Sequence, residues 1–110
     1  MAIDVQSLIE SMTSAAVSAA KGHAEDLKEF IDSHTQLIAD GVAAIGTDLA
    51  AGNITADDAQ FAFDQIKDEQ ATELLAISVT LKAAAQDAIN AALDVAASVA
   101  SKALGIALTA

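Results

Sequence analysis

Apolar and small residues recur at spacings of 4, 4 and 3 along most of the chain, and this pattern constrains the fold more than any other feature. An 11-residue repeat corresponds to about 3.67 residues per turn, so its members stay on one face of a nearly straight helix. In the first half, the repeat comprises Leu8, Met12, Ala16, Ala19, His23, Leu27, Phe30, His34, Ile38, Gly41, Ile45 and Leu49. In the second half, it comprises Ala59, Phe63, Ile66, Gln70, Leu74, Ile77, Leu81, Ala85, Ala88, Ala92, Ala96, Val99, Ala103 and Ile106. The spacing predicts an all-α protein.

One clear break separates the two repeats, at residues 51–58. Gly52 can adopt the left-handed conformation that ends a helix, and Thr55 can cap the next helix with Asp58 three residues later. Proline is absent, so little else in the chain interrupts a helix. We therefore expect a single helical domain over residues 1–110, with helices at about 4–51 and 56–108 joined by a turn at about 52–55. Equal repeats on both sides of one turn favour an antiparallel hairpin.

Two helices cannot cover all the apolar surface of this chain, because the second half carries an additional apolar stripe. Dimerisation into a four-helix bundle is the simplest completion, and it predicts a homodimer. The residues expected at the interface are Ile89, Leu93, Leu104, Ile106 and Leu108. The alternative is a monomeric four-helix bundle, kinked near Lys21-Gly22 and near Lys82.

The formal charge of −11 excludes nucleic-acid binding as a plausible function. The five positive side chains are all lysines, and they form no basic patch. Asp87, Asp94 and Lys102 interrupt the most apolar stretch, residues 83–110, so no transmembrane span is expected. The first residues lack the pattern of a secretory signal, and a cytoplasmic location is the expectation.

His34 and Gln70 are polar residues within the two apolar repeats. They are candidate site residues, because the predicted hairpin places them near each other. A hydrogen-bonded core pair that sets the helix register explains both residues. The functional alternative is a pH-sensitive contact, since histidine changes charge near neutral pH. The Glu-x-x-His signature of di-iron bundles is absent, because Ala20 and Ile31 precede the two histidines by three positions. No metal or cofactor is expected.

No motif for catalysis is found, so we expect a protein that is not an enzyme. The leading hypothesis is a structural or interaction module that self-assembles through apolar helix faces. A surface-active protein that binds lipid or another hydrophobe is the second hypothesis, and a metal-binding bundle is the third. Phe61 lies outside the apolar repeat. It is expected to pack under the turn or against a second subunit, with recognition of a partner as the alternative.

Overall fold

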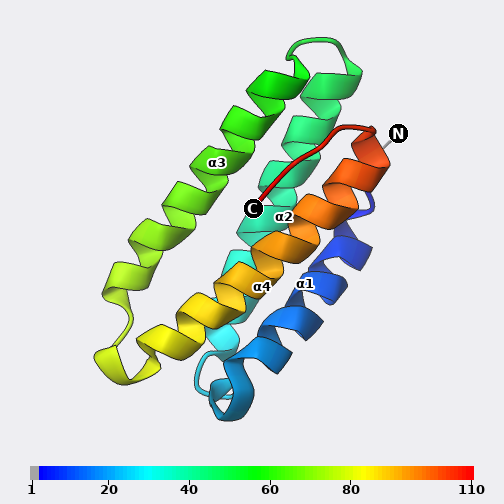
Figure 1. Ribbon diagram of the computed structural model, residues 1–110. Coiled ribbons are helices and arrows are strands. Elements are labelled where there is room, and N and C mark those ends of the chain that lie inside the picture. The colour runs from blue at the N-terminus through cyan, green and yellow to red at the C-terminus, as the bar shows by residue number, and fades with distance from the viewer. Residues whose placement is uncertain (1–2) are drawn as a thin grey trace.

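The computed structural model describes residues 3–110, and all regular structure in that range is helical. The helices are α1 (Val5–Ala20), α2 (Lys28–Ala50), α3 (Ala56–Glu73) and α4 (Val79–Leu104), with short 3-10 turns at Lys21–His23 and Leu74–Ala76. Successive helices run in opposite directions along an elongated bundle of 44 × 24 × 18 Å (Figure 1). The all-α prediction is confirmed.

The structure differs from the two predicted long helices, because each is broken once. The first breaks at Lys21, whose φ of 51° and ψ of −130° end α1 and reverse the chain. The second breaks at residues 74–78, where Ile77 is extended with a ψ of 141°. Residues 3–110 thus form four α-helices, as in the kinked alternative, although the second kink lies before Val79 and not near Lys82.

The physical reason for these breaks is the extra apolar stripe, which a single pair of long helices would leave in water. Folding each half into two helices covers that stripe inside one chain. Ile89, Leu93 and Leu108 are buried in the single chain, and Leu104 and Ile106 are half-buried. The single chain thus covers these five residues wholly or in part, and the subunit interface that the sequence predicts at them stays a prediction.

The turn between α2 and α3 lies where the sequence places it. Gly52 has a φ of 77°, a conformation that costs glycine little. The Thr55 hydroxyl accepts a hydrogen bond from the Asp58 backbone N–H at 3.2 Å, and Asp58 Oδ2 accepts one from the Thr55 N–H at 3.0 Å. This reciprocal pair is a capping box, and it satisfies donors that the first turn of α3 would otherwise leave free.

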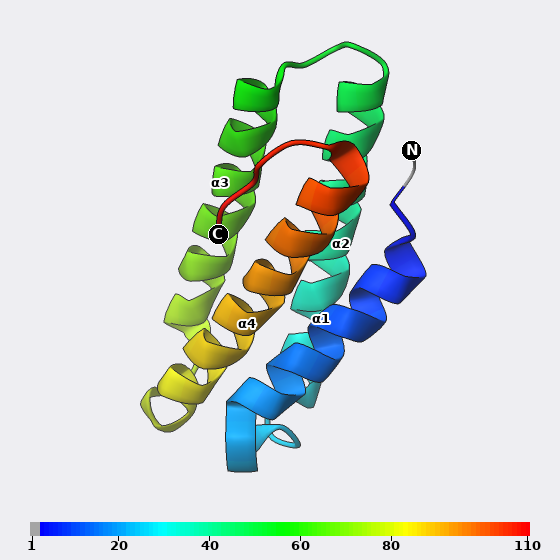
Figure 2. The same ribbon diagram turned by 45° about the vertical axis from the view of Figure 1, so that its right-hand side comes forward.

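Helices α1 and α4 form the most extensive contact in the bundle. Their buried faces are rich in alanine, which allows two helix backbones to approach closely. The buried residues are Leu8, Met12, Ala16 and Ala20 in α1 and Ala85, Ala88, Ile89, Ala92, Leu93, Ala96, Ala97 and Ala100 in α4. Helix α3 lies at the side of the bundle and packs chiefly on α2 (Figure 2). Among all members of the 11-residue repeat, only His23 is exposed.

Candidate functional site

The α2–α3 interface brings His34 and Gln70 together, 36 residues apart in sequence. His34 Nδ1 donates a hydrogen bond to Gln70 Oε1, and both side chains are buried. The Phe30 ring lies against the imidazole, with centroids 4.3 Å apart and planes tilted by 40°. The pair therefore ties α2 to α3 inside the core. Its sensitivity to pH stays a prediction.

Thr35 is a buried polar residue that sequence reasoning missed. Its hydroxyl donates to the Ile31 carbonyl at 2.8 Å and lies 3.4 Å from the hydroxyl of Thr13 on α1. Thr35 is completely buried because α2 contacts α1 and α4 as well as α3. A single apolar repeat indicates only one buried face, so it gave no sign of this second one.

The outer surface of the α2–α3 hairpin carries an open groove of about 270 Å³, which we call the acidic groove. Its lining combines buried apolar side chains, which we call the floor, with three exposed carboxylates, which we call the rim. Its lining residues are Gly41, Ala44, Ile45, Asp48, Ile54, Asp58, Ala62, Gln65, Ile66 and Glu69. Such a mixture of apolar floor and charged rim is typical of a protein-binding groove more than of a reaction centre.

Regular spacing puts these residues on one face of each helix. Leu37, Gly41, Ala44 and Asp48 follow each other on α2 at steps of 4, 3 and 4, as do Asp58, Ala62, Gln65 and Glu69 on α3. A Cβ atom at Gly41 would stand 2.7 Å from Ile66 Cδ1, so the Ile66 side chain packs into the space that glycine leaves free on α2. The spacing was visible in the sequence, but it lay outside the dominant apolar repeat.

Two large apolar side chains of the α2–α3 hairpin point into solvent, although neither lines the groove itself. Leu37 is 56% exposed and shares the face of α2 that lines the groove, whereas Phe61 is 66% exposed and lies on a different face of α3 from Ala62. The alternative that Phe61 packs under the turn is therefore wrong in the single chain. Exposed aromatic and aliphatic side chains beside a groove are the usual anchors of a protein interface.

Negative charge is concentrated on the same part of the molecule. Residues 25–73 hold twelve of the sixteen acids and two of the five lysines. Both lysines stand beside acids, with Lys28 Nζ 2.7 Å from Asp32 Oδ2 and Lys67 Nζ 3.7 Å from Asp64 Oδ1. The Asp32 carboxylate raises the pKa of Lys28 through a hydrogen bond. The face around the groove is thus strongly anionic.

The capping box also acts on the charge of the rim. The hydrogen bond from the Thr55 backbone N–H lowers the pKa of the Asp58 carboxyl, and the Thr55 side chain adds to this effect. Asp58 is therefore ionised at neutral pH. One residue thus serves both the start of α3 and the negative potential of the acidic groove.

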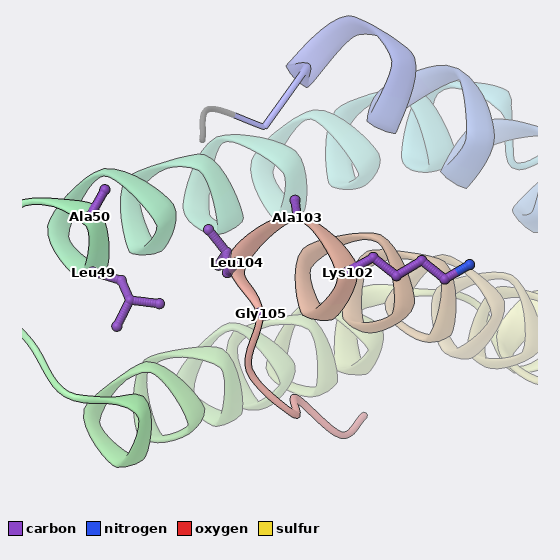
Figure 3. Close-up of a pocket in the computed structure, with 6 residues that line it drawn as sticks. All are labelled: Leu49, Ala50, Lys102, Ala103, Leu104 and Gly105. Atoms are coloured by element: carbon purple, nitrogen blue, oxygen red, sulfur yellow. The ribbon is translucent and has the colours of Figure 1, made fainter.

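A second hollow, of about 350 Å³, lies between the ends of α2 and α4 (Figure 3). Leu49 and Leu104 project into the space beside Gly105, whereas the amine of Lys102 points away along α4. No carboxylate or imidazole lines this hollow. It offers mainly apolar contact, and Lys102 is the titratable residue among those that line it.

Neither histidine belongs to a metal-ligating cluster. His23 lies on the surface, with Nδ1 4.0 Å from Asp26 Oδ2. Over residues 3–110, no three histidine, aspartate or glutamate side chains are grouped so that they could hold a metal ion. Within the same range, no helix has the length and apolar character needed to cross a membrane. No protein-family model, curated protein or solved structure matches this chain.

Proposed function

We propose that this chain is a non-enzymatic protein-interaction module, and that its acidic groove binds a basic amphipathic helix of a partner protein. The observation that carries the proposal is the combination of an apolar groove, a carboxylate rim and two exposed apolar side chains on one hairpin. A partner helix that presents leucine-like residues toward the floor and lysine or arginine toward the rim would match each element.

Charge and apolar area have separate roles in this proposal. The excess of acids over residues 25–73 attracts a basic partner over a distance of about 8–10 Å at physiological salt, and thus raises the association rate. Leu37 and Phe61 provide area that is removed from water in the complex, and thereby slow dissociation. The small side chains of Ala44 and Ala62 leave room for the backbone of a helix.

This proposal modifies the hypothesis that apolar helix faces drive self-assembly. The residues expected at that interface are already covered or half-covered by their own chain. A lipid-binding role is disfavoured for the hairpin, because its acids would be repelled by anionic headgroups. A metal-binding role is less well supported than binding at the groove, because residues 3–110 hold no cluster of metal ligands.

The test is binding of a synthetic helical peptide, measured by fluorescence anisotropy of a label on the peptide. The peptide carries leucines at helical positions i, i+3, i+4 and i+7 and lysines elsewhere, and its control replaces every lysine by glutamate. The lysine peptide should bind, with an affinity that falls as salt is raised, and the glutamate peptide should not.

Two pairs of variants locate the site. Asp48→Lys with Glu69→Lys should weaken binding about tenfold or more, equivalent to about 1.4 kcal/mol. The matched control is Glu10→Lys with Asp94→Lys, which makes the same change of net charge on exposed residues of α1 and α4. Equal loss of affinity in both variants would show attraction to the overall charge and not to the groove.

The contribution of the exposed apolar residues Leu37 and Phe61 is tested with a second pair of variants in the same anisotropy assay. Leu37→Ser with Phe61→Ser should also weaken binding about tenfold. Val17→Ser with Val79→Ser is the control, because both valines are exposed but lie on α1 and α4. Unchanged affinity in the Leu37 and Phe61 variant would exclude the groove as the binding surface.

A further inference from the structure

The residues that follow α4 do not continue the helix but cross the bundle as an extended segment. Gly105, with a φ of 68°, ends α4, and residues 106–110 then run toward α3 in both views (Figures 1 and 2). We call residues 105–110 the tail segment. Few direct contacts join α3 to α4, so the tail segment links two helices that otherwise scarcely touch.

Two polar side chains hold the backbone of the tail segment. The Leu108 N–H donates to Ser101 Oγ at 2.9 Å, and that hydroxyl lies 3.3 Å from the Leu108 carbonyl. On α3, the Gln60 amide pairs with the backbone of Thr109, accepting from its N–H at 3.0 Å and donating to its carbonyl at 3.1 Å. The Leu108 side chain is buried, with 7% of its surface exposed. Ser101, Gln60 and the apolar site around Leu108 form what we call the tail seat.

The tail seat has the properties of a binding site for an extended peptide. Its hydrogen bonds go to backbone groups, which any extended peptide offers, and its selectivity comes from one buried leucine. None of these bonds is part of a helix, so release of the tail segment leaves the four helices intact. Gly105 is the natural pivot, because glycine adopts several backbone conformations at little cost.

We infer that the tail seat of one chain accepts the tail segment of a second copy. A second copy presents the identical leucine and backbone groups, so every bond seen within the chain can form between chains with no new surface. This exchange would make Ile106 and Leu108 intersubunit residues and would join two copies at their α3–α4 sides. It involves no residue of the acidic groove and stands independently of the function proposed above.

The absence of cysteine from the chain makes a direct test possible. One chain carries Gln60→Cys and another carries Thr109→Cys, and the two are mixed at high micromolar concentration with oxidised glutathione. A disulfide between them forms efficiently only when the tail segment of one copy reaches α3 of the other. We expect a covalent heterodimer on a non-reducing gel, at a yield several-fold above a control mixture.

The control mixture pairs the Thr109→Cys chain with a Ser14→Cys chain, because Ser14 is exposed on α1, whereas the polar groups of the tail seat belong to α3 and α4. Circular dichroism establishes that each chain is folded. A second comparison adds Leu108→Asp to the Thr109→Cys chain, which removes the buried leucine but keeps the thiol. Its heterodimer yield should fall to the control level. Exchange is refuted if the Gln60 and Thr109 chains give no more heterodimer than the control, or if Leu108→Asp leaves the yield unchanged.

Discussion

The imidazole of His34 donates a hydrogen bond to the side-chain carbonyl of Gln70 inside the contact between α2 and α3. Both residues are buried polar members of the apolar repeat, and each gives the other a hydrogen-bond partner in the core. The same contact holds α3, the most peripheral helix, to the rest of the bundle.

Removal of one member of this pair should cost more than removal of both. Gln70→Leu leaves the His34 N–H without its acceptor in the core and should lower the free energy of unfolding by about 1–3 kcal/mol. His34→Leu combined with Gln70→Leu should restore part of that loss, because no polar group is then left unpaired. His34→Leu alone completes a double-mutant cycle, and the stabilities of the three variants and the original chain are measured by urea denaturation monitored by circular dichroism.

Gln36→Leu is the matched control for this cycle. Gln36 is exposed on α2, so this substitution makes the same chemical change at the surface and not in the core. It should alter stability by less than about 0.5 kcal/mol. Additive effects of the His34 and Gln70 substitutions would contradict the contact.

The turn between α2 and α3 should be sensitive at two positions. Gly52→Ala places a Cβ atom on a residue with a φ of 77° and should cost about 1 kcal/mol. Thr55→Ala removes the capping hydroxyl and should cost a similar amount, about 1 kcal/mol. Because a Cβ atom at Gly52 would meet no neighbouring atom within 4 Å, the loss of stability in Gly52→Ala would reflect backbone conformation alone. Unchanged urea midpoints in both variants would exclude this account of the turn.

Replacement of Lys21 by glycine should raise the free energy of unfolding. The φ of 51° and ψ of −130° at Lys21 lie in a region that strains any residue with a Cβ atom. Lys21→Gly relieves about 1–3 kcal/mol of strain and adds about 0.5–1 kcal/mol of backbone entropy cost, so a net gain of about 1 kcal/mol is expected. Lys21→Ala removes the charge but keeps the Cβ atom, and its urea midpoint should match that of the original chain. A gain of equal size in both variants would assign the effect to charge and not to strain.

Acid should weaken the caps of α1 and α3. The Ser7 backbone N–H, with help from the Ser7 hydroxyl, lowers the pKa of the Asp4 carboxyl, and Thr55 lowers the pKa of Asp58 in the same manner. A carboxyl whose folded pKa is depressed stabilises the fold above its unfolded pKa, about 3.9 for aspartate, and loses this contribution as pH falls through the folded value. Stability should therefore decrease with acid below about pH 4.

Asp4→Asn combined with Asp58→Asn tests this effect, because asparagine keeps a side-chain oxygen as a cap but does not titrate. The urea midpoint of the variant should change less between pH 5 and 2.5 than that of the original chain. The control is Asp87→Asn combined with Asp94→Asn, since both residues are exposed on α4 and neither caps a helix. Parallel pH profiles for the original chain and the Asp4 and Asp58 variant would exclude the capping effect.

Part of the candidate site could be predicted from the sequence. The contact of His34 with Gln70 follows from two repeats of equal period folded about one turn, since that geometry fixes which positions face each other. The acidic groove was harder to foresee, because Leu37 and Phe61 lie outside the buried repeat. The tail seat could not be predicted from the sequence, because Gln60 and Thr109 are 49 residues apart and no periodic pattern relates them.

The sequence by itself determined the helical class, the turn at Gly52 to Thr55 and the residues that face the core. These properties are local, because helix periodicity, a left-handed glycine and a capping box each depend on a few neighbouring residues. Only the tertiary structure decided that each half breaks again, at Lys21 and at residues 74–78, and that Ile89 and Leu93 are covered within one chain. Apolar area drives that outcome, because four short helices bury both stripes that two long helices would expose, and the gain depends on contacts between residues far apart in sequence.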